Sequence, residues 1–294
     1  LVNSGDTDAC AVLTANIDLS SKYGADIDGA EVSWEPIGDG TKQFKGTFDG
    51  GNFTISGLYI NGTNMYQGLF GYLGQGGTIQ NLSVSGTVNG YFFVAGVVGT
   101  NDGGSISNCI NHCTVTGSSF VGGIVGQNTG SSNFVATVKD CSNYGAITCT
   151  NPVASAGGIV GSNSDLNTLV KDCKNYGSIS GGSGSTFGYT GGIVGQNYGT
   201  VTGCINEKEA HISGGEAYSI GGIVGYNFCE IANCYNLGET TMTDDATTAY
   251  IGGIAGLSYL PPTPFDGTCK IENCYSYTDS AVPYSAEGST TNCY

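Results

Sequence analysis

The sequence contains no arginine, and its eight basic residues, all lysines, face 24 Asp and Glu residues, so that the formal net charge is -16. A protein that binds nucleic acid neutralises phosphates with clustered basic residues. Clamps for carboxylates and phosphates usually depend on the arginine fork. The composition therefore argues against nucleic-acid binding and against arginine-dependent catalysis, and the acidic charge gives no attraction to anionic membranes.

Long apolar runs and prolines are also scarce. No segment approaches the roughly 20 apolar residues that a membrane-spanning helix needs, and residues 1–8 do not resemble a signal peptide. Glycine supplies 51 residues and proline only 6, without a three-residue period, which excludes collagen and proline-rich disorder. We expect a chain that does not insert into membranes, with enough apolar residues, 39%, to fill a core.

One glycine-bounded phrase recurs along the chain. Its starts are 27 to 35 residues apart, which indicates a constant core with loops of variable length. The copies are Gly68-Leu-Phe-Gly71, Gly96-Val-Val-Gly99, Gly123-Ile-Val-Gly126, Gly158-Ile-Val-Gly161, Gly192-Ile-Val-Gly195, Gly222-Ile-Val-Gly225 and Gly253-Ile-Ala-Gly256.

Each glycine phrase is followed by a second phrase that centres on a cysteine in six of seven copies, and in several repeats by a third short segment such as Ala146-Ile-Thr-Cys149. All three segments are β-branched or alternating, and Gly, Asn, Ser and Asp bound them, which is typical of strands and turns. The sequence predicts an all-β fold: a right-handed parallel β-helix, or β-solenoid, of about seven coils with three short strands each.

Stacked columns of identical residues support this register. Isoleucines of the glycine phrase are expected to form one inward column, and asparagines after it to form an amide ladder, because side-chain amides can hydrogen-bond from coil to coil. A second asparagine column lies two residues after the cysteines. The predicted ladder positions of the first column are Asn128, Asn163, Asn197 and Asn227, preceded by Asn101.

The glycine phrases, preceded by Trp34-Glu-Pro-Ile-Gly38 and by Phe44-Lys-Gly-Thr-Phe-Asp-Gly-Gly-Asn52, resemble the GLUG-motif repeats of bacterial surface proteins. Such repeats occur in immunoglobulin A protease-like proteins and in large adhesins, and the resemblance covers roughly residues 30 to 280. It implies a right-handed β-helical stalk. It implies no catalytic residues, because the motif residues build coils and carry no shared chemistry.

The domain prediction is an N-terminal cap over residues 1–43 and one continuous solenoid over residues 44–294. A cap is expected because a terminal coil leaves strand edges unpaired, and Trp34, the only tryptophan, is expected to pack beneath it. Asn292-Cys-Tyr294 repeats Asn233-Cys-Tyr235 and Asn273-Cys-Tyr275, so we expect the native polypeptide to continue.

Twelve cysteines raise the question of disulfides or metal sites. Adjacent coils would bring stacked Cα atoms to roughly 4.8 Å, which permits disulfides, but the parallel direction of the side chains favours an inward ladder of free thiols. Cys10, Cys113, Cys149 and Cys293 lie outside the main column or at the ends and could pair differently. The main column consists of Cys109, Cys141, Cys173, Cys204, Cys234 and Cys274.

Sites for chemistry are few. The only histidines, His112 and His211, belong to no metal or nucleophile motif, and no Cys-x-x-Cys pair occurs, so we expect no cofactor and no metal. Asp244-Asp245 is the only adjacent acidic pair for glycoside hydrolysis. Asp26, Asp28 and Glu31 are interpreted as an acidic turn rather than a calcium loop.

The longest loop within a repeat, residues 257–268, contains Tyr259 and Phe265, which we predict as ligand-binding residues.

These observations favour a non-enzymatic repeat module of a secreted or cell-surface bacterial protein, acting as a stalk or as an adhesive surface for a host protein or glycan. Two alternatives remain open: a polysaccharide-degrading β-helix enzyme, and an accessory domain of a larger secreted protease.

Overall fold

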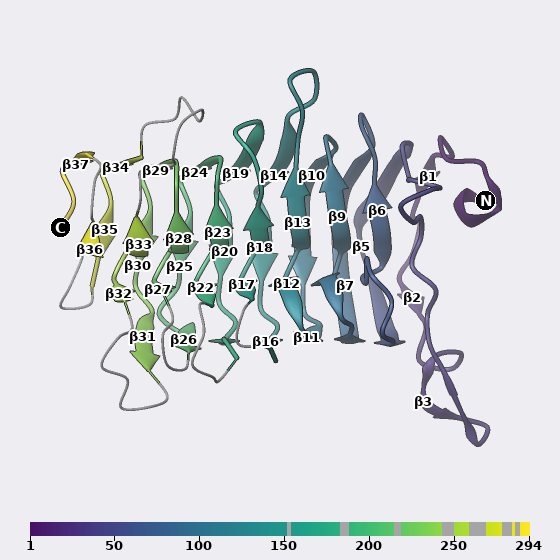
Figure 1. The fold of residues 1–294 in the computed structure, drawn as a ribbon. Coiled ribbons are helices and arrows are strands. Elements are labelled where there is room, and N and C mark those ends of the chain that lie inside the picture. Colours follow the sequence, from purple (N-terminus) through teal and green to yellow (C-terminus); the bar gives the residue numbers. More distant parts are fainter. Residues whose placement is uncertain are drawn as a thin grey trace.

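Short strands that are about 30 residues apart in the sequence lie side by side as parallel ladders along a rod (Figure 1). The computed structural model describes residues 1–151, 154–182, 188–214, 219–242, 250–258, 269–277, 284–285 and 289–294. The N-terminus lies at one end of the rod and the C-terminus at the other (Figure 1). The predicted all-β parallel β-solenoid is confirmed, and about six complete turns are described.

Three parallel sheets form the walls. The largest sheet has 21 strands, namely β1 (Ala11–Val12), β2 (Ile17–Asp18), β5 (Thr47–Asn61), β7 (Thr78–Asn89), β10 (Ser105–Asn111), β11 (Thr114–Gly117), β14 (Ala136–Lys139), β15 (Ser142–Asn143), β16 (Ile147–Cys149), β19 (Thr168–Lys171), β20 (Lys174–Asn175), β21 (Ile179–Ser180), β24 (Thr200–Thr202), β25 (Ile205–Asn206), β26 (His211–Gly214), β29 (Glu230–Ala232), β30 (Tyr235–Asn236), β31 (Glu239–Met242), β34 (Lys270–Glu272), β35 (Tyr275–Ser276) and β37 (Ser289–Thr291).

The other two parallel sheets contain the strands before and after each glycine corner. The six-stranded sheet consists of β8 (Phe92–Ala95), β12 (Ser119–Gly122), β17 (Ser155–Gly157), β22 (Tyr189–Gly191), β27 (Ser219–Gly221) and β32 (Tyr250–Gly252). The eight-stranded sheet consists of β6 (Phe70–Leu73), β9 (Val98–Asp102), β13 (Val125–Thr129), β18 (Val160–Asn163), β23 (Val194–Asn197), β28 (Val224–Asn227), β33 (Ala255–Ser258) and β36 (Tyr284–Ser285).

A typical turn contains five short strands, so the expected three per coil is wrong. The turn from β18 to β22 is an example. The glycine phrase contains a corner between the six-stranded and the eight-stranded sheet. A second corner lies before the cysteine, where Asp140 and Asp172 have φ of 54° and 52°. This left-handed backbone bends the chain, because it cannot continue an extended strand, and it divides the predicted second strand in two.

The core is a set of stacked apolar columns. The isoleucines of the glycine phrase are fully buried, with 0% exposure for Ile124, Ile159, Ile193, Ile223 and Ile254. Parallel pairing brings equivalent residues into register, as with Val160 and Val194. Because side chains alternate between the two faces of a strand, one inward position in each turn suffices to continue a column through the rod.

The first position of the glycine phrase requires glycine because the carbonyl of the equivalent glycine in the next coil and an asparagine amide both lie where a side chain would begin. A Cβ on Gly192 would lie 2.6 Å from the amide carbon of Asn206, and Gly123 stands in the same relation to Asn143, at 2.5 Å. Both amides are fully buried and cannot withdraw into solvent. The first glycine of these phrases therefore recurs because neighbouring backbone and a buried asparagine amide fill the space of a side chain, and the second glycine, such as Gly126, recurs because backbone atoms of the preceding coil do so.

The N-terminal residues cover the first edge of the large sheet. Here β1 and β2 pair in parallel with β5, and β3 (Gly24–Ile27) pairs with β4 (Ala30–Val32) in an antiparallel hairpin that projects from this end (Figure 1). A 3-10 helix, η1 (Val2–Ser4), precedes them. In the part of the chain that the structure describes, no helix is long and apolar enough to cross a bilayer. The boundary at residue 43 stays a prediction.

Candidate functional site

Two asparagine ladders run inside the solenoid. Each amide donates an N–H to the Oδ1 of its equivalent in the next coil, over 2.8–2.9 Å, and every member is fully buried. Serines end both ladders, at Ser258 and Ser276. Since all donors point the same way, the bonds polarise one another. The ladders are Asn101–Asn128–Asn163–Asn197–Asn227 and Asn111–Asn143–Asn175–Asn206–Asn236.

The cysteine column lies beside the second ladder, and its members from Cys109 to Cys274 are buried free thiols. Cys173 donates to the carbonyl of Lys171 at 3.2 Å, and Cys141 makes the same bond to Lys139. Burial raises the pKa of the Cys173 thiol well above its ordinary value, because an ionised sulfur in this core has no solvation. Every member of the column is at most 1% exposed, so the thiols form part of the packed core and are closed to reagents from solvent.

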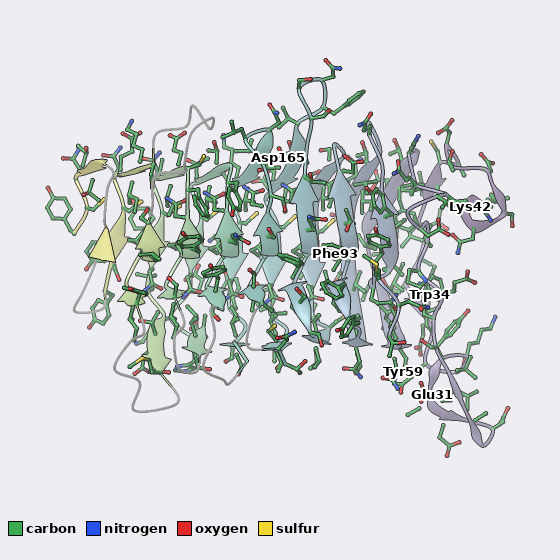
Figure 2. The ribbon with its side chains drawn as sticks, in the orientation of Figure 1. Glu31, Trp34, Lys42, Tyr59, Phe93 and Asp165 are labelled. Carbon is green, nitrogen blue, oxygen red and sulfur yellow. The ribbon has the colours of Figure 1, made fainter. Side chains whose placement is uncertain are left out.

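An aromatic ladder lies on the flank where the six-stranded sheet meets the eight-stranded one. Tyr66, Phe93 and Phe120 stack with centroids 5.5 and 5.4 Å apart, and Figure 2 shows Phe93 on this flank. All three have left-handed backbone, with φ of 62°, 54° and 51°, which is costly for aromatic residues. The half-buried rings cover one another's faces, so this ladder stabilises a corner more than it offers a binding surface.

The N-terminal end of the core contains a cavity of about 400 Å³. Trp34, Tyr23 and Phe44 are among its mainly apolar lining. The indole Nε1–H of Trp34 donates to the carbonyl of Leu69 at 3.2 Å, and the Trp34 ring packs edge-to-face on Tyr23, with centroids 5.2 Å apart. Figure 2 shows Trp34 at this end of the rod. Trp34 therefore contributes to closing the end of the core, as the sequence predicted.

The ligand-binding residues predicted from the sequence, Tyr259 and Phe265, lie outside the described residues, as do Asp244 and Asp245. Asp26 accepts the N–H of Gly29 at 2.9 Å, in the turn between β3 and β4. Within the described ranges, no group of three or more His, Cys, Asp or Glu side chains is placed to hold a metal ion.

The histidines lie in different surroundings. The ring of His112 stacks on Tyr144 with centroids 5.0 Å apart. The Nδ1 of His211 lies 3.5 Å from the Oε2 of Glu239, and both side chains are more than 60% exposed. An ion pair so exposed contributes little to stability.

Exposed tyrosines and asparagines form a face near the C-terminal end, outside the cysteine column. Tyr235, Tyr275 and Tyr294 occupy equivalent positions in consecutive coils, because each donates its backbone N–H to the cysteine carbonyl of the preceding coil, at 3.0–3.1 Å. Their side chains are 48%, 41% and 74% exposed, whereas the aromatic rings of the other flank are half-buried. We define the tyrosine–asparagine face as Asn233, Tyr235, Asn273, Tyr275, Asn292 and Tyr294, with Leu237 and Tyr277 at its edge.

The corner before each cysteine aims this face outward. Asn233, Asn273 and Asn292 have φ of 55°, 52° and 52°, a conformation that asparagine tolerates better than most residues. The cysteine that follows points into the core, and the tyrosine after it points to solvent, since side chains alternate along a strand. The asparagine amides remain exposed and are joined from coil to coil, at 3.4 Å between Asn273 and Asn233 and 3.1 Å between Asn292 and Asn273.

A second row of side chains continues from the edge of this face toward the N-terminus. Backbone hydrogen bonds place His112, Tyr144, Tyr176, Glu207, Leu237 and Tyr277 at equivalent corner positions. The rings of Tyr144 and Tyr176 are 4.4 Å apart and nearly parallel. Burial, followed by the negative charge of Glu207, raises the pKa of Tyr176 to about 12, so its hydroxyl stays protonated and can donate a hydrogen bond.

Sequence reasoning did not identify the tyrosine–asparagine face, although its signal was present. The triplet Asn-Cys-Tyr occurs three times near the C-terminus, and an inward cysteine requires an outward neighbour on each side. In the sequence alone, the triplet indicated only that the repeat recurs and that the native polypeptide was expected to continue.

Comparison with known proteins supports the repeat assignment. The family model described as "The GLUG motif" matches residues 216–241, which include the phrase Gly222–Gly225. A protein of Evansella cellulosilytica that carries the provisional name Gly-rich membrane protein is 38% identical over 94 residues, 31% of this chain and 10% of that protein. Halomucin of Haloquadratum walsbyi is 38% identical over 92 residues, 30% of this chain and 1% of halomucin.

The fold also has a counterpart among solved structures. A Bacteroides ovatus protein with the provisional name immunoglobulin A1 protease superposes with a TM-score of 0.61 at 21% identity, and the match covers 99% of this chain and 79% of that one. At this identity, the likeness concerns the fold alone. The chain spans only a small part of the curated relatives that it matches. Together, the findings confirm the predicted resemblance, and the chain carries a GLUG motif within a parallel β-solenoid.

Proposed function

We propose that this chain is a non-enzymatic module of a secreted or cell-surface protein, and that it combines the roles of spacer and adhesive surface. The solenoid supports the first role, since a continuous ladder of backbone hydrogen bonds makes a stiff rod with a long lateral surface. The names of two relatives, a membrane protein and halomucin, support a location at the cell boundary.

The tyrosine–asparagine face carries the adhesive part of the proposal. Five of its members, Tyr235, Leu237, Tyr275, Tyr277 and Tyr294, have exposures from 36% to 76%. Contiguous exposed apolar surface on a folded protein marks an interaction site, and tyrosine is enriched at such sites because its ring gives large contact area and its hydroxyl a polar handle. A host protein or glycan is the expected partner.

An adhesion assay tests this proposal. Beads coated with the protein are expected to bind target cells or mucus-coated surfaces, and the double variant Tyr235→Ser/Tyr275→Ser to bind them several-fold less. Tyr91→Ser is the matched control, because Tyr91 is 47% exposed but precedes β8, far from the face in the sequence and the coil order. Equal adhesion by the wild type and the double variant would remove this face as the adhesive surface.

The absence of catalysis is part of the proposal and has its own test. Incubation with a panel of neutral and acidic polysaccharides is expected to release no reducing ends and no unsaturated products. Turnover of any of them would favour the alternative, a polysaccharide-degrading β-helix enzyme.

A second candidate function is an accessory module of a larger secreted protease. The likeness in fold to the Bacteroides ovatus protein named as an immunoglobulin A1 protease supports it. The full gene tests it, since this candidate requires a protease domain in the same polypeptide.

A further inference from the structure

The tyrosine–asparagine face repeats one pair of groups in three consecutive coils. Each pair consists of a corner asparagine and the tyrosine two residues later. Parallel pairing places Tyr235 directly opposite Tyr275, and Tyr294 donates its N–H to the carbonyl of Cys274 as Tyr275 does to that of Cys234. Successive coils are separated by about 4.8 Å, so equivalent groups recur at this spacing along the rod. A surface with such a repeat suits a ligand that has a repeat of its own.

The asparagine amides form a polar row beside the tyrosines. The Nδ2 of Asn273 bonds to the Oδ1 of Asn233, and the Nδ2 of Asn292 to the Oδ1 of Asn273. An amide has two N–H donors and two acceptor lone pairs, so these bonds use only part of the capacity of each side chain. All three amides are exposed, and their remaining donors and acceptors face solvent next to the rings.

The side chains of the face are uncharged although the chain carries a net charge of -16. Asparagine, tyrosine and leucine make up all eight of its positions. Glu272, which precedes Asn273, pairs with Lys270, and the Oε2 of Glu239, two residues after Leu237, lies 3.5 Å from the Nδ1 of His211. An acidic polymer would meet no basic side chain at these eight positions and would be repelled by the rest of the molecule, while a basic partner would find no carboxylate side chain among them. The chemistry of the face therefore selects a neutral ligand.

We propose that the tyrosine–asparagine face binds a linear neutral polysaccharide that lies parallel to the rod axis, with one sugar residue to each coil. The C–H faces of a pyranose pack on tyrosine rings, and its hydroxyls bond to amides and phenols that can both donate and accept. Successive coils advance by roughly 4.8 Å, a spacing comparable to the length of one pyranose residue in an extended β-linked chain, so each asparagine–tyrosine pair contacts one sugar. This inference rests on the proposed adhesive role and specifies its ligand.

A protein partner is the competing occupant. A folded protein contacts an exposed face over an irregular area and has no reason to follow a three-coil period. A basic protein would be attracted by the net negative charge, and its binding would weaken steeply as salt is added. The periodic, uncharged face favours the polysaccharide, and salt dependence separates the two.

Affinity electrophoresis and calorimetry on the whole chain test the inference. The probes are hydroxyethyl cellulose, glucomannan, xylan and dextran, with polygalacturonate and hyaluronan as acidic counterparts, each at low and high salt. Binding to at least one neutral β-linked polymer, unchanged by salt, is expected. With oligosaccharides of the polymer that binds, affinity should rise from the disaccharide to the trisaccharide and then level off, since the face has three asparagine–tyrosine pairs. Preference for the acidic polymers, or affinity indifferent to length, would overturn the inference.

Substitutions test whether the polysaccharide binds at the tyrosine–asparagine face. Tyr275→Ala is expected to weaken binding about three- to tenfold, and Tyr275→Phe, which keeps the ring, much less. Asn273→Gly removes an amide while tolerating the left-handed backbone. Its matched control is Asn108→Gly, at the equivalent corner of an earlier coil, where Asn108 is exposed, has φ of 52° and bonds to Asn81 at 3.2 Å.

The outcomes separate this inference from the function on which it rests. Loss of polysaccharide binding in Tyr275→Ala and Asn273→Gly, but not in Tyr91→Ala or Asn108→Gly, supports it, provided that circular dichroism and melting are unchanged. Equal losses in the face and control variants would overturn it. If coated beads still adhere through this face while every polysaccharide fails to bind, the adhesive function stands and the polysaccharide is excluded as its ligand.

Discussion

Replacement of Asn175 by alanine tests whether the buried amide ladder holds the coils together. Asn175 is fully buried. Its Nδ2 donates to the carbonyl of Gly177 and to the Oδ1 of Asn206, both at 2.9 Å. Its Oδ1 accepts from the Nδ2 of Asn143 at 2.9 Å and from the backbone N–H of Gly177 at 3.2 Å. One side chain therefore connects three successive coils.

The expected cost follows from the groups that lose this partner. The Nδ2 of Asn143 keeps its bond to the carbonyl of Gly145, and the N–H of Gly177 keeps its bond to the carbonyl of Asn143. The carbonyl of Gly177 and the Oδ1 of Asn206 lose the amide donor in a site closed to water. A buried polar group without a partner costs about 1–3 kcal/mol, so Asn175→Ala should lower the free energy of unfolding by about 4 kcal/mol. That is a large part of the stability of a typical domain, about 5–15 kcal/mol.

Urea unfolding followed by circular dichroism measures this change. Native-state hydrogen exchange adds its location, because the stability of a repeat protein is close to a sum over neighbouring coils. Faster exchange should concentrate in the coils that contain Asn143, Asn175 and Asn206. The control is Asn61→Ala, since Asn61 is exposed and its amide bonds to Glu31 at 3.0 Å; it should change stability by about 0.5 kcal/mol or less. Similar losses in the two variants would refute the view that the ladder joins the coils.

Three further predictions concern the core. Gly192→Ala should lower the melting temperature clearly, because its Cβ would collide with the carbonyl oxygen of Gly222 and lie 2.6 Å from the buried Asn206 amide carbon. Gly62→Ala, whose Cβ would have no atom nearer than 3.8 Å, should leave the melting temperature unchanged, and equal shifts in the two melting curves would contradict the packing argument. Burial raises the pKa of the Cys113 thiol from 9.0 to about 12, so the stability that this thiol contributes is fully present below pH 9 and is lost as the pH rises toward 12. Cys113→Ala should therefore flatten the dependence of the unfolding midpoint on pH in that range, and an unchanged slope would contradict this linkage. In the native protein a thiol reagent should label the exposed Cys10 within minutes and Cys113 only after denaturation, as peptide mapping would show; early labelling of Cys113 would mean that the core opens.

The sequence by itself determined the solenoid. Recurrence of a glycine phrase, a cysteine and two asparagines at matching intervals fixes the register, since a slip of one residue would turn each column from the core to solvent. The buried isoleucines, the asparagine ladders and the likeness to GLUG repeats could all be predicted on that basis. Trp34 at the end of the core could also be predicted, because terminal coils need a cover.

The tertiary structure alone decided how the coils bend and what they present. It shows that Asp140 and Asp172 make a left-handed corner that divides one predicted strand into two. It also shows that the first glycine of the phrase is required by the backbone of the next coil and by an amide of the large sheet, as with Gly192 against Gly222 and Asn206. These relations depend on contacts between residues that are distant in the sequence. For the same reason, the face formed by Tyr235 and its equivalents became visible only when successive coils lay side by side, since no single coil contains it.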